Sequence, residues 1–273
     1  MKLKPAVSHR SVAVHGDGMQ PATRKVPAEV PVAFVYDGSA EAVMMATPAD
    51  LEDFALGFCL NERVIGSPTG LEALEILEVG RGIELRIALD APEREGMAVR
   101  RRRHAGPAGC GLCGIESLED ALPTLPVVGA GLRLTAGEII AAMRAMTPLQ
   151  RLNAETRAVH AAGFYVRGDG IVALREDVGR HNALDKLAGA MARACRDPAA
   201  GAILVTSRLS VELVQKAAIM GSPILAAVSA PTALAIEEAE KAGITLCGIV
   251  RDDGLEMFTH AERIGLEATA HAR

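Results

Sequence analysis

Residues 202–250, AILVTSRLSVELVQKAAIMGSPILAAVSAPTALAIEEAEKAGITLCGIV, decide the fold of this chain. Three short apolar runs alternate here with two segments of helical composition; the runs cover residues 202–206, 224–228 and 244–250. A hydroxyl residue precedes each helical segment as its N-cap, and a glycine ends it. These four residues are Ser210, Gly221, Thr232 and Gly243. Fully apolar strands that alternate with helices predict an α/β fold, with a parallel sheet covered by helices.

The same alternation predicts where a ligand binds. In open parallel sheets, ligands lie beyond the carboxyl ends of the strands and close to helix N-termini. The residues expected at this edge are Ser207, Arg208, Ser229, Thr232, Ile249, Val250, Arg251, Asp252, Asp253 and Gly254. Helix capping accounts for the hydroxyl residues but not for Arg208 and Arg251. We therefore expect a pocket for a nucleotide with phosphates at this edge.

Composition divides the chain into four parts. Residues 1–28 are polar and aperiodic, and they predict a flexible tail. Residues 29–120 predict a smaller α+β domain, and residues 121–134, which contain two prolines, predict a linker. Residues 135–273 predict the α/β domain that carries the ligand pocket.

Alternation and capping predict individual elements within these parts. Strands are expected at residues 30–36, 41–46 and 83–89, and two more within residues 163–174. Thr47 and Pro48 are expected to open a helix as its cap and first residue. Thr135 and Glu138 form a capping box for a helix that continues to Met146. Residues 182–196 predict an amphipathic helix.

A pair of thiols, Cys110 and Cys113, lies in a predicted long loop at residues 96–114. Glycines flank both cysteines, and four arginines at residues 100–103 precede them. Nearby positive charge stabilises the thiolate, and two adjacent thiols can act on one sulfur atom in turn. A run of arginines is also typical of an ordinary solvent-exposed loop without a role at a ligand or partner. Our hypothesis is that Cys110 carries a persulfide and that Cys113 is its partner or a second carrier.

The composition argues against several classes of protein. The other cysteines, Cys59, Cys195 and Cys247, lie on apolar stripes and are expected to be small buried residues, so we expect reduced thiols and a cytoplasmic protein. No apolar segment is long enough to span a bilayer. The aromatic content is 3% and the net charge is −5, which argues against nucleic-acid binding.

Two other classes of protein also use paired cysteines. A thiol–disulfide oxidoreductase places its pair at a strand-to-helix junction, whereas this pair lies in a glycine-rich loop. A structural zinc site needs two further ligands; His104 is near, but no second pair follows at a usual spacing, so no metal is expected. The signature of zinc deaminases is also absent from the sequence.

Three motifs together resemble those of the FdhD/NarQ family. They are CGLCG at residues 110–114, EDVGRHNALDK at residues 176–186 and SRLSVE at residues 207–212. TPADL at residues 47–51 and GF at residues 57–58 extend the resemblance to about residues 29–260. It implies a cytidine deaminase-like α/β core, a smaller N-terminal portion and a homodimer.

The resemblance also implies a function. Family members are sulfur carriers, with the sulfurtransferase activity needed for formate dehydrogenase. A cysteine desulfurase loads sulfur on the thiol pair as a persulfide, and the carrier passes it to the molybdenum cofactor, bis(molybdopterin guanine dinucleotide), before insertion into the enzyme. The resemblance places the guanine nucleotide at the edge predicted above. His181 is a candidate for the ligand side or for proton handling, and His160 a weaker one.

The chain departs from the family pattern at three positions. Arg157 stands where the family usually has glycine, in a Thr-Gly-Gly sequence ahead of His160. Arg63 also replaces a usual glycine, and Asp37 an asparagine that is often found. Glycine beside a ligand permits close approach of the backbone, so the change at Arg157 bears on the geometry around His160. Glu176 and Asp177 are expected to be structural, anchoring Arg180 or Lys186.

Overall fold

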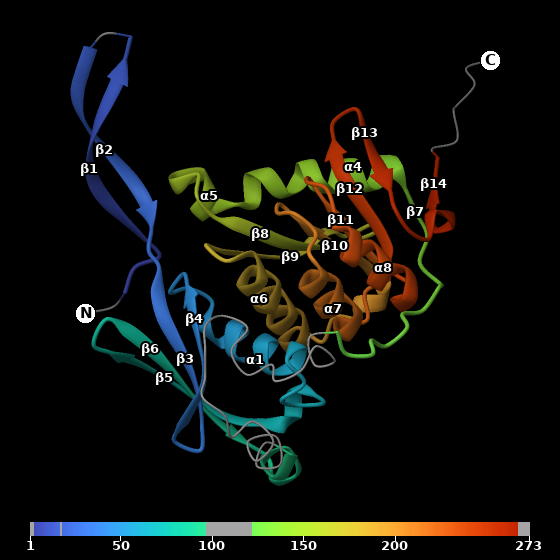
Figure 1. Ribbon diagram of the computed structural model, residues 1–273, viewed down its shortest axis with the longest axis horizontal. Coiled ribbons are helices and arrows are strands. Elements are labelled where there is room, and N and C mark those ends of the chain that lie inside the picture. The colour runs from blue at the N-terminus through green and yellow to red at the C-terminus, as the bar shows by residue number, and fades with distance from the viewer. Residues whose placement is uncertain (1–2, 17, 97–121, 267–273) are drawn as a thin grey trace.

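A computed structural model describes residues 3–16, 18–96 and 122–266 of the chain (Figure 1). Cys110, Cys113 and the four arginines lie outside these ranges. Of the predicted loop at residues 96–114, only Gly96 is described, and it ends a helical segment at residues 91–96. No helix in the described residues is long and apolar enough to cross a membrane.

The C-terminal half contains a six-stranded sheet in the order β13-β12-β11-β10-β8-β9. The strands are β8 (His160–Val166), β9 (Gly170–Asp177), β10 (Gly201–Val205), β11 (Ile224–Ala227), β12 (Thr245–Arg251) and β13 (Gly254–Met257). Only β10, β11 and β12 run parallel. The three strands from which the sequence predicts a parallel sheet are therefore parallel, but the whole sheet is mixed: β8 pairs antiparallel with β10, and β8–β9 and β12–β13 are hairpins, in which pairing is antiparallel.

Helices cover both faces of this sheet, which gives three layers (Figure 1). One face carries α6 (Arg180–Arg193), α7 (Val211–Met220) and α8 (Ala233–Ala242). The other face carries α4 (Ala136–Met146), with η2 (Thr147–Leu149) and α5 (Arg151–Thr156) beyond its end. The predicted capping box of Thr135 and Glu138 is confirmed, and the Thr232 hydroxyl caps α8. Ser210 occupies the N-cap position of α7, but its side chain makes no capping bond.

The N-terminal half contains a four-stranded sheet in the order β4-β3-β6-β5. The strands are β3 (Val30–Tyr36), β4 (Ser39–Ala46), β5 (Leu71–Val79) and β6 (Gly82–Leu89), with η1 (Pro68–Gly70) before β5. Helix α1 (Leu51–Asn61) covers one face, and the rings of Phe34 and Phe58 stack there with centroids 3.9 Å apart. The predicted start of this helix at Pro48 is wrong, because the Thr47 hydroxyl and backbone bond to the segment around Asp177 instead.

Two glycines let the halves of the molecule approach closely. A Cβ atom on Gly57 of α1 would lie 1.7 Å from the Asp185 carbonyl oxygen of α6, and one on Gly189 of α6 would lie 1.9 Å from the Asp53 carbonyl oxygen of α1. Such distances exclude any side chain. Backbone contact between these helices therefore fixes how the N-terminal sheet sits against the C-terminal half.

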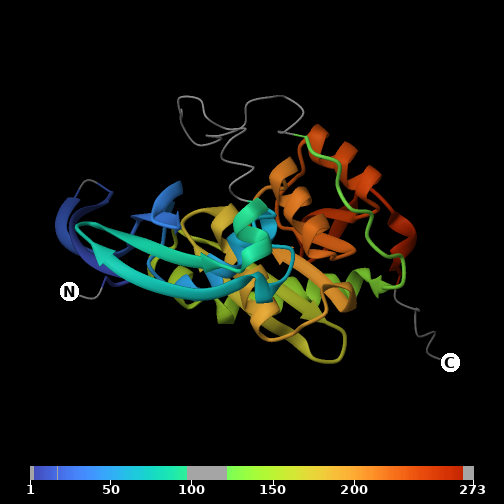
Figure 2. The same cartoon turned by 90° about the horizontal axis from the view of Figure 1, so that it is seen from below.

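The predicted N-terminal tail is instead a β-hairpin, which we call the arm. Its strands are β1 (Ala6–His15) and β2 (Gly18–Pro27), paired at ten positions. Figure 2 shows the arm and the β5–β6 hairpin extending away from the C-terminal sheet. The prediction was wrong because both strands are largely exposed, so neither carries the alternation by which a half-buried strand is recognised.

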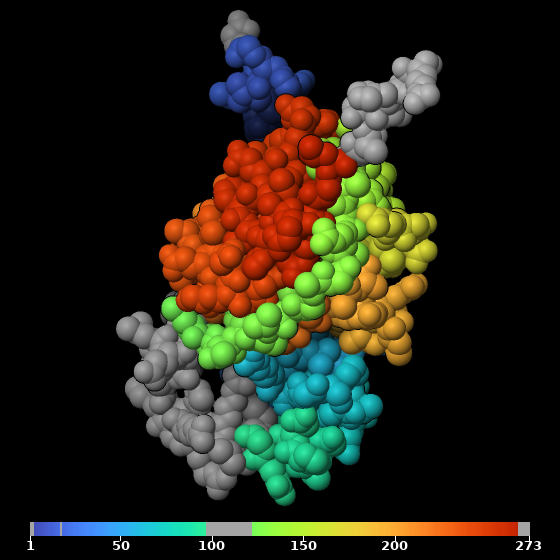
Figure 3. Space-filling model, turned by 90° about the vertical axis from the view of Figure 1, so that its right-hand side faces the viewer, coloured from blue at the N-terminus to red at the C-terminus, as the bar shows by residue number. Residues whose placement is uncertain are grey.

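The predicted linker packs along the surface of the C-terminal half. Its described residues, 122–133, are irregular, and Figure 3 shows them as a green band across that surface. Val128 is buried, and its N–H donates to the Ala242 carbonyl at the end of α8 (2.9 Å). Next to the linker, the short strand β7 (Leu134–Thr135) pairs with β14 (Ile264–Gly265), which follows η4 (Ala261–Arg263). The remaining short helix, η3 (Pro198–Ala200), precedes β10.

Candidate functional site

The segments that follow β10, β11 and β12 lie side by side at the carboxyl edge of the sheet. The Leu209 N–H donates to the Ala230 carbonyl (3.3 Å), and the Thr232 N–H donates to the Leu209 carbonyl (3.0 Å). The Ile249 N–H donates to the Ser229 carbonyl (3.2 Å). These bonds bring together the residues that the sequence predicts at this edge.

Not every predicted residue offers its side chain to a ligand. The Ser207 hydroxyl is buried and donates to the Arg208 carbonyl (3.0 Å), and the Thr232 hydroxyl accepts the N–H of Ala235 as a helix cap (3.3 Å). Arg208 is exposed, and Ser229 is half-buried. The edge therefore presents an arginine and one serine from these two segments, beside the N-termini of α7 and α8.

Arg251 and Asp252 define the far end of the edge. The Arg251 guanidinium lies across the end of β11 and donates to the carbonyls of Val228 and Val250. The Asp252 carboxylate accepts from the Arg144 guanidinium of α4, with N–O distances of 3.0 and 3.1 Å. Arg144 was not predicted as part of this edge, because nothing within the α4 sequence indicates a partner 108 residues away.

The backbone of β12 is distorted where it enters the edge. Ile249 has φ 52°, a left-handed conformation that a β-branched residue rarely adopts, and the register with β13 shifts between Gly248 and Arg251. A Cβ on Gly248 would lie 2.9 Å from the Phe258 ring and 3.2 Å from the Ser229 oxygen. Such strain is concentrated at binding sites, where the surroundings hold it in place.

A second group of polar side chains lies where α6 and α7 begin. His181 Nε2 is 3.4 Å from Ser210 Oγ and 3.7 Å from Glu212 Oε2. Burial, together with the neighbouring Arg180 charge, lowers the pKa of His181 to about 4, so the imidazole is neutral at pH 7. Burial raises the pKa of Glu212, but hydrogen bonds from Ser210 and from its own N–H outweigh this and lower it overall.

Arg180 connects this group with the second candidate histidine. Burial, followed by the Arg180 charge, lowers the pKa of His160, which begins β8. Arg180 Nε is buried and has no hydrogen-bond partner in the described part of the chain. The positive charge of Arg180 thus acts on both His160 and His181, and it favours the neutral imidazole at each.

The motif at residues 176–186 joins the two halves of the molecule. Lys186 is fully buried and donates to Asp177 Oδ2 (2.6 Å) and to the Thr47 carbonyl (2.9 Å). The Glu176 carboxylate accepts the N–H groups of Leu152 and Asn153 at the start of α5 (2.8 and 2.7 Å). Of the two alternatives expected from the sequence, Arg180 and Lys186, Asp177 therefore anchors Lys186. Glu176 holds the start of α5.

The three departures from the family pattern share one backbone property. Asp37, Arg63 and Arg157 have φ angles of 49°, 53° and 57°. Glycine and asparagine adopt this left-handed region most easily, which explains their use by the family there. Arg157 lies in this region as the C-cap of α5, where its backbone N–H donates to the Asn153 carbonyl.

The described cysteines differ in exposure. Cys59 and Cys247 are buried, as expected, and burial raises the pKa of each thiol to about 12. Cys195 is exposed, so that prediction was wrong: α6 ends at Arg193, and Cys195 turns away with φ 50°. No group of three or more His, Cys, Asp or Glu residues is placed to hold a metal ion in residues 3–16, 18–96 and 122–266.

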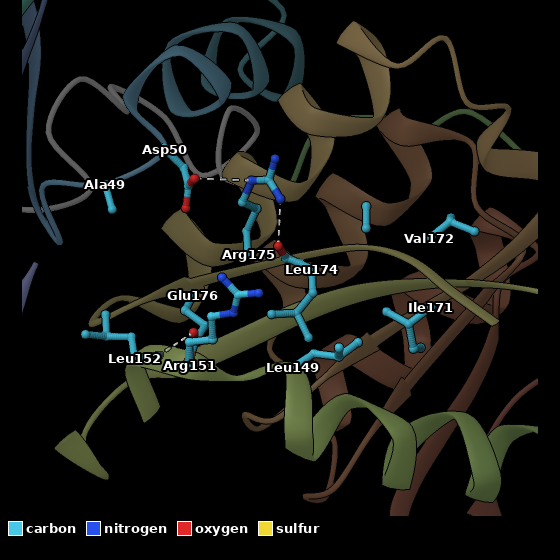
Figure 4. A pocket seen from close by; sticks show the side chains of 11 residues that line it. Ala49, Asp50, Leu149, Arg151, Leu152, Ile171, Val172, Leu174, Arg175 and Glu176 are labelled. Carbon is cyan, nitrogen blue, oxygen red and sulfur yellow. Dashed lines mark hydrogen bonds and ion pairs between the residues drawn. The ribbon is translucent and has the colours of Figure 1, made fainter. Parts of the chain in front are cut away.

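A separate cavity of about 460 Å³ runs beside β9, the edge strand of the sheet (Figure 4). In this view Arg175 borders the cavity above and Arg151 borders it below. The Arg175 guanidinium lies 3.7 Å from the Asp50 carboxylate and donates to the Leu174 carbonyl. None of the residues that the sequence predicts at the carboxyl edge lines this cavity.

Comparisons with known proteins agree with the three motifs. The model of the FdhD/NarQ family matches residues 27–265. Sulfur carrier protein FdhD of Agrobacterium fabrum is 55% identical over 247 residues, which covers 89% of this chain and 91% of that protein. The protein of the same name from Brucella abortus is 49% identical over 264 residues, 96% and 97% of the two chains. A crystal structure from Desulfotalea psychrophila, described as a formate dehydrogenase accessory protein, has 25% identity and a TM-score of 0.77, over 96% of this chain and 100% of that one.

Proposed function

This chain belongs to the FdhD/NarQ family, and from that premise we propose that it is a sulfur carrier that serves formate dehydrogenase. It takes persulfide sulfur from a cysteine desulfurase and delivers it to bis(molybdopterin guanine dinucleotide), its substrate, before that cofactor enters the dehydrogenase. The names of the relatives support the carrier role, and that of the solved structure supports the role in formate dehydrogenase maturation.

Sulfur transfer uses the thiol pair. The Cys110 thiolate attacks the terminal sulfur of the desulfurase persulfide, the S–S bond of the donor breaks, and the donor cysteine leaves as a thiolate. Cys110 then holds the sulfur until the acceptor takes it, with Cys113 as its partner or second carrier. The four arginines at residues 100–103 support this role, since nearby cations raise the thiolate fraction of a cysteine whose pKa is ordinarily about 8.5.

The observation that carries the substrate assignment is the convergence of three strand ends on one charged edge. Its donor set fits a guanine dinucleotide: the N-termini of α7 and α8 and the guanidinium groups of Arg208 and Arg251 suit phosphates, and a carboxylate suits the guanine N–H groups. Asp252 is engaged by Arg144, which makes Asp253 the freer of the two adjacent carboxylates. Because its pKa is lowered to about 4, His181 beside Glu212 is a weak base at pH 7, which favours a role on the ligand side, as a hydrogen-bonding group, over proton handling.

Calorimetric titration with GDP tests this assignment. Arg208→Ala and Arg251→Ala each remove a charged hydrogen-bond donor, which is worth roughly 1.5–3 kcal/mol, so GDP affinity should fall about ten- to hundredfold. Arg81→Ala is the matched control, since Arg81 is an exposed arginine between β5 and β6. If both edge variants bind GDP as tightly as the wild type and the control do, the nucleotide binds elsewhere.

A further inference from the structure

The cavity beside β9 adjoins an edge of the C-terminal sheet that no described strand covers (Figure 4). β9 is the last strand in the order of that sheet and pairs only with β8. An edge strand presents a row of backbone N–H and C=O groups, with which another extended segment can pair. The cavity volume of about 460 Å³ lies in the range of ligand pockets. This edge therefore offers both a strand to pair with and space beside it.

The rest of the chain closes only the far end of β9. The Arg175 guanidinium donates to the Leu174 carbonyl (2.7 Å) and lies 2.6 Å from the Asp53 carboxylate. The Glu176 carboxylate accepts N–H groups at the start of α5. No comparable contact reaches residues 170–173 from the described part of the chain. About 13 Å of the edge, the length of four residues, is left open.

The open part of β9 lacks the residues that protect edge strands from unwanted pairing. Residues 170–174 read GIVAL, with neither a charge nor a proline. By contrast, β5 at the edge of the N-terminal sheet carries three glutamates. β13, the other edge of the C-terminal sheet, is only four residues long and includes a glutamate. β9 has a register shift against β8, but this irregularity places no charge on the edge.

Apolar side chains line the cavity along this edge. Ile171, Val172 and Leu174 come from β9, and Leu149 and Leu152 come from η2 and α5 (Figure 4). Leu149 is 45% exposed, although it follows a helix that covers the core. Alternate side chains of an added strand point to one side, so every second residue of such a strand faces this wall. The lining therefore favours a segment with apolar residues at alternate positions.

One guanidinium at the cavity lacks a counterion. Arg151, the first residue of α5, is exposed, and its side chain makes no ion pair or hydrogen bond with the described residues. The other charged groups are engaged: Arg175 lies against Asp50 and Asp53, and Glu176 accepts backbone N–H groups. The unbalanced charge is positive, which favours an acidic residue in the segment that binds here.

We propose that β9 is a docking site for an extended segment of a partner protein. The segment adds a strand along residues 171–174, packs alternate apolar side chains on Leu149 and Leu152, and pairs an acidic side chain with Arg151. In this mode of recognition main-chain hydrogen bonds supply affinity, and the side chains supply specificity. None of the residues assigned to the nucleotide edge lines the cavity, so docking here leaves that edge open to its substrate.

A phage-displayed library of random octapeptides, selected against the full chain, tests the proposal. Recovered peptides should alternate apolar residues and contain an acidic one; each is then synthesised with a fluorophore and titrated by anisotropy. Arg151→Glu should weaken binding at least tenfold, whereas Arg81→Glu, at an exposed arginine between β5 and β6, should leave it unchanged. Leu149→Glu should also weaken binding, and Leu266→Glu, at a leucine that is 87% exposed and outside the cavity lining, should not.

Two modified peptides identify the mode of binding. Replacing the acidic residue of the peptide by lysine should restore affinity for Arg151→Glu, because the ion pair is then reversed. Methylation of alternate peptide nitrogens should abolish binding, since it removes main-chain donors and keeps every side chain. In amide hydrogen exchange, the unmodified peptide should slow exchange in β9 and leave exchange in β13 unchanged.

Four results would overturn the proposal. The first is a selection that yields no acidic peptide, and the second is equal affinity of the peptides for wild type and Arg151→Glu. The third is undiminished binding of the methylated peptides, which would mean that the cavity takes side chains or a small ligand without strand pairing. The fourth is protection of β9 that rises with protein concentration in the absence of peptide, since a second copy would then occupy the edge. Thermal melts should confirm that each variant is folded before it is titrated.

Discussion

Three of the described residues with a left-handed backbone are the departures from the family pattern, and glycine adopts this conformation at less cost. For an L-residue the left-handed region costs roughly 1–2 kcal/mol. Asp37, Arg63 and Arg157 all lie in it, at positions where the family usually has asparagine or glycine. Of the three, Arg157 is exposed at the C-cap of α5, where the backbone N–H of the cap bonds to Asn153 whatever the side chain.

Arg157→Gly should therefore stabilise the protein. Glycine relieves the left-handed strain but adds freedom to the unfolded chain, and the balance should raise the free energy of unfolding by up to about 1 kcal/mol. Urea denaturation measures it. Ala158→Gly is the control: its φ is not positive, so only the entropic cost applies and stability should fall. A loss of stability in both variants would contradict the explanation.

His181 should make the protein less stable in acid. Its folded pKa of about 4 lies below the usual 6.5, so the unfolded chain binds the proton more readily. This group's contribution is complete above pH 6.5 and is lost as the pH falls towards 4. His181→Gln removes the titration, so its unfolding free energy should fall less steeply between pH 6.5 and 4 than that of wild type. If the unfolding free energies of wild type and His181→Gln change in parallel with pH, the imidazole is not held neutral in the folded protein.

At the scale of elements, the contact between α1 and α6 decides how the two halves fit. Gly57→Ala places a methyl group inside the backbone of α6, and overpacking of this severity should cost about 3 kcal/mol or more. Gly131→Ala is the matched control, because nothing lies within 4 Å of its Cβ position and its φ is not positive. Chemical denaturation should separate the two variants clearly; equal stability would mean that the helices are farther apart than described.

The elements that the sequence predicted well are those with a local signal. The capping box at Thr135, the strand at residues 30–36 and the alternation after residue 201 each depend on neighbours within a few positions. β5 was missed because its glutamates recur every third residue, which conceals a strand period of two. The arm was missed because both of its strands are largely exposed, so neither shows the alternation of a half-buried strand.

At the scale of the whole molecule, the sequence predicted the carboxyl edge of the C-terminal sheet but not the side-chain contacts that other elements make there. Alternating strands and helices imply that the ends of β10, β11 and β12 meet, and they do. The contact of His181 with Ser210, and that of Arg144 with Asp252, join residues 29 and 108 positions apart. Such pairs follow from helix packing, which the pattern of a single chain does not reveal.

Persulfide mapping tests the central claim, that this chain carries sulfur on Cys110. The protein is incubated with a cysteine desulfurase and cysteine, and its peptides are analysed by mass spectrometry. We expect 32 Da of added sulfur, about the mass of one sulfur atom, on the peptide with Cys110 and Cys113, and none on Cys59 or Cys247, whose buried thiols stay protonated. Cys110→Ala should abolish the loading, whereas Cys195→Ala, which removes an exposed thiol, should not change it. Loading that persists in Cys110→Ala and disappears in Cys195→Ala would contradict the account.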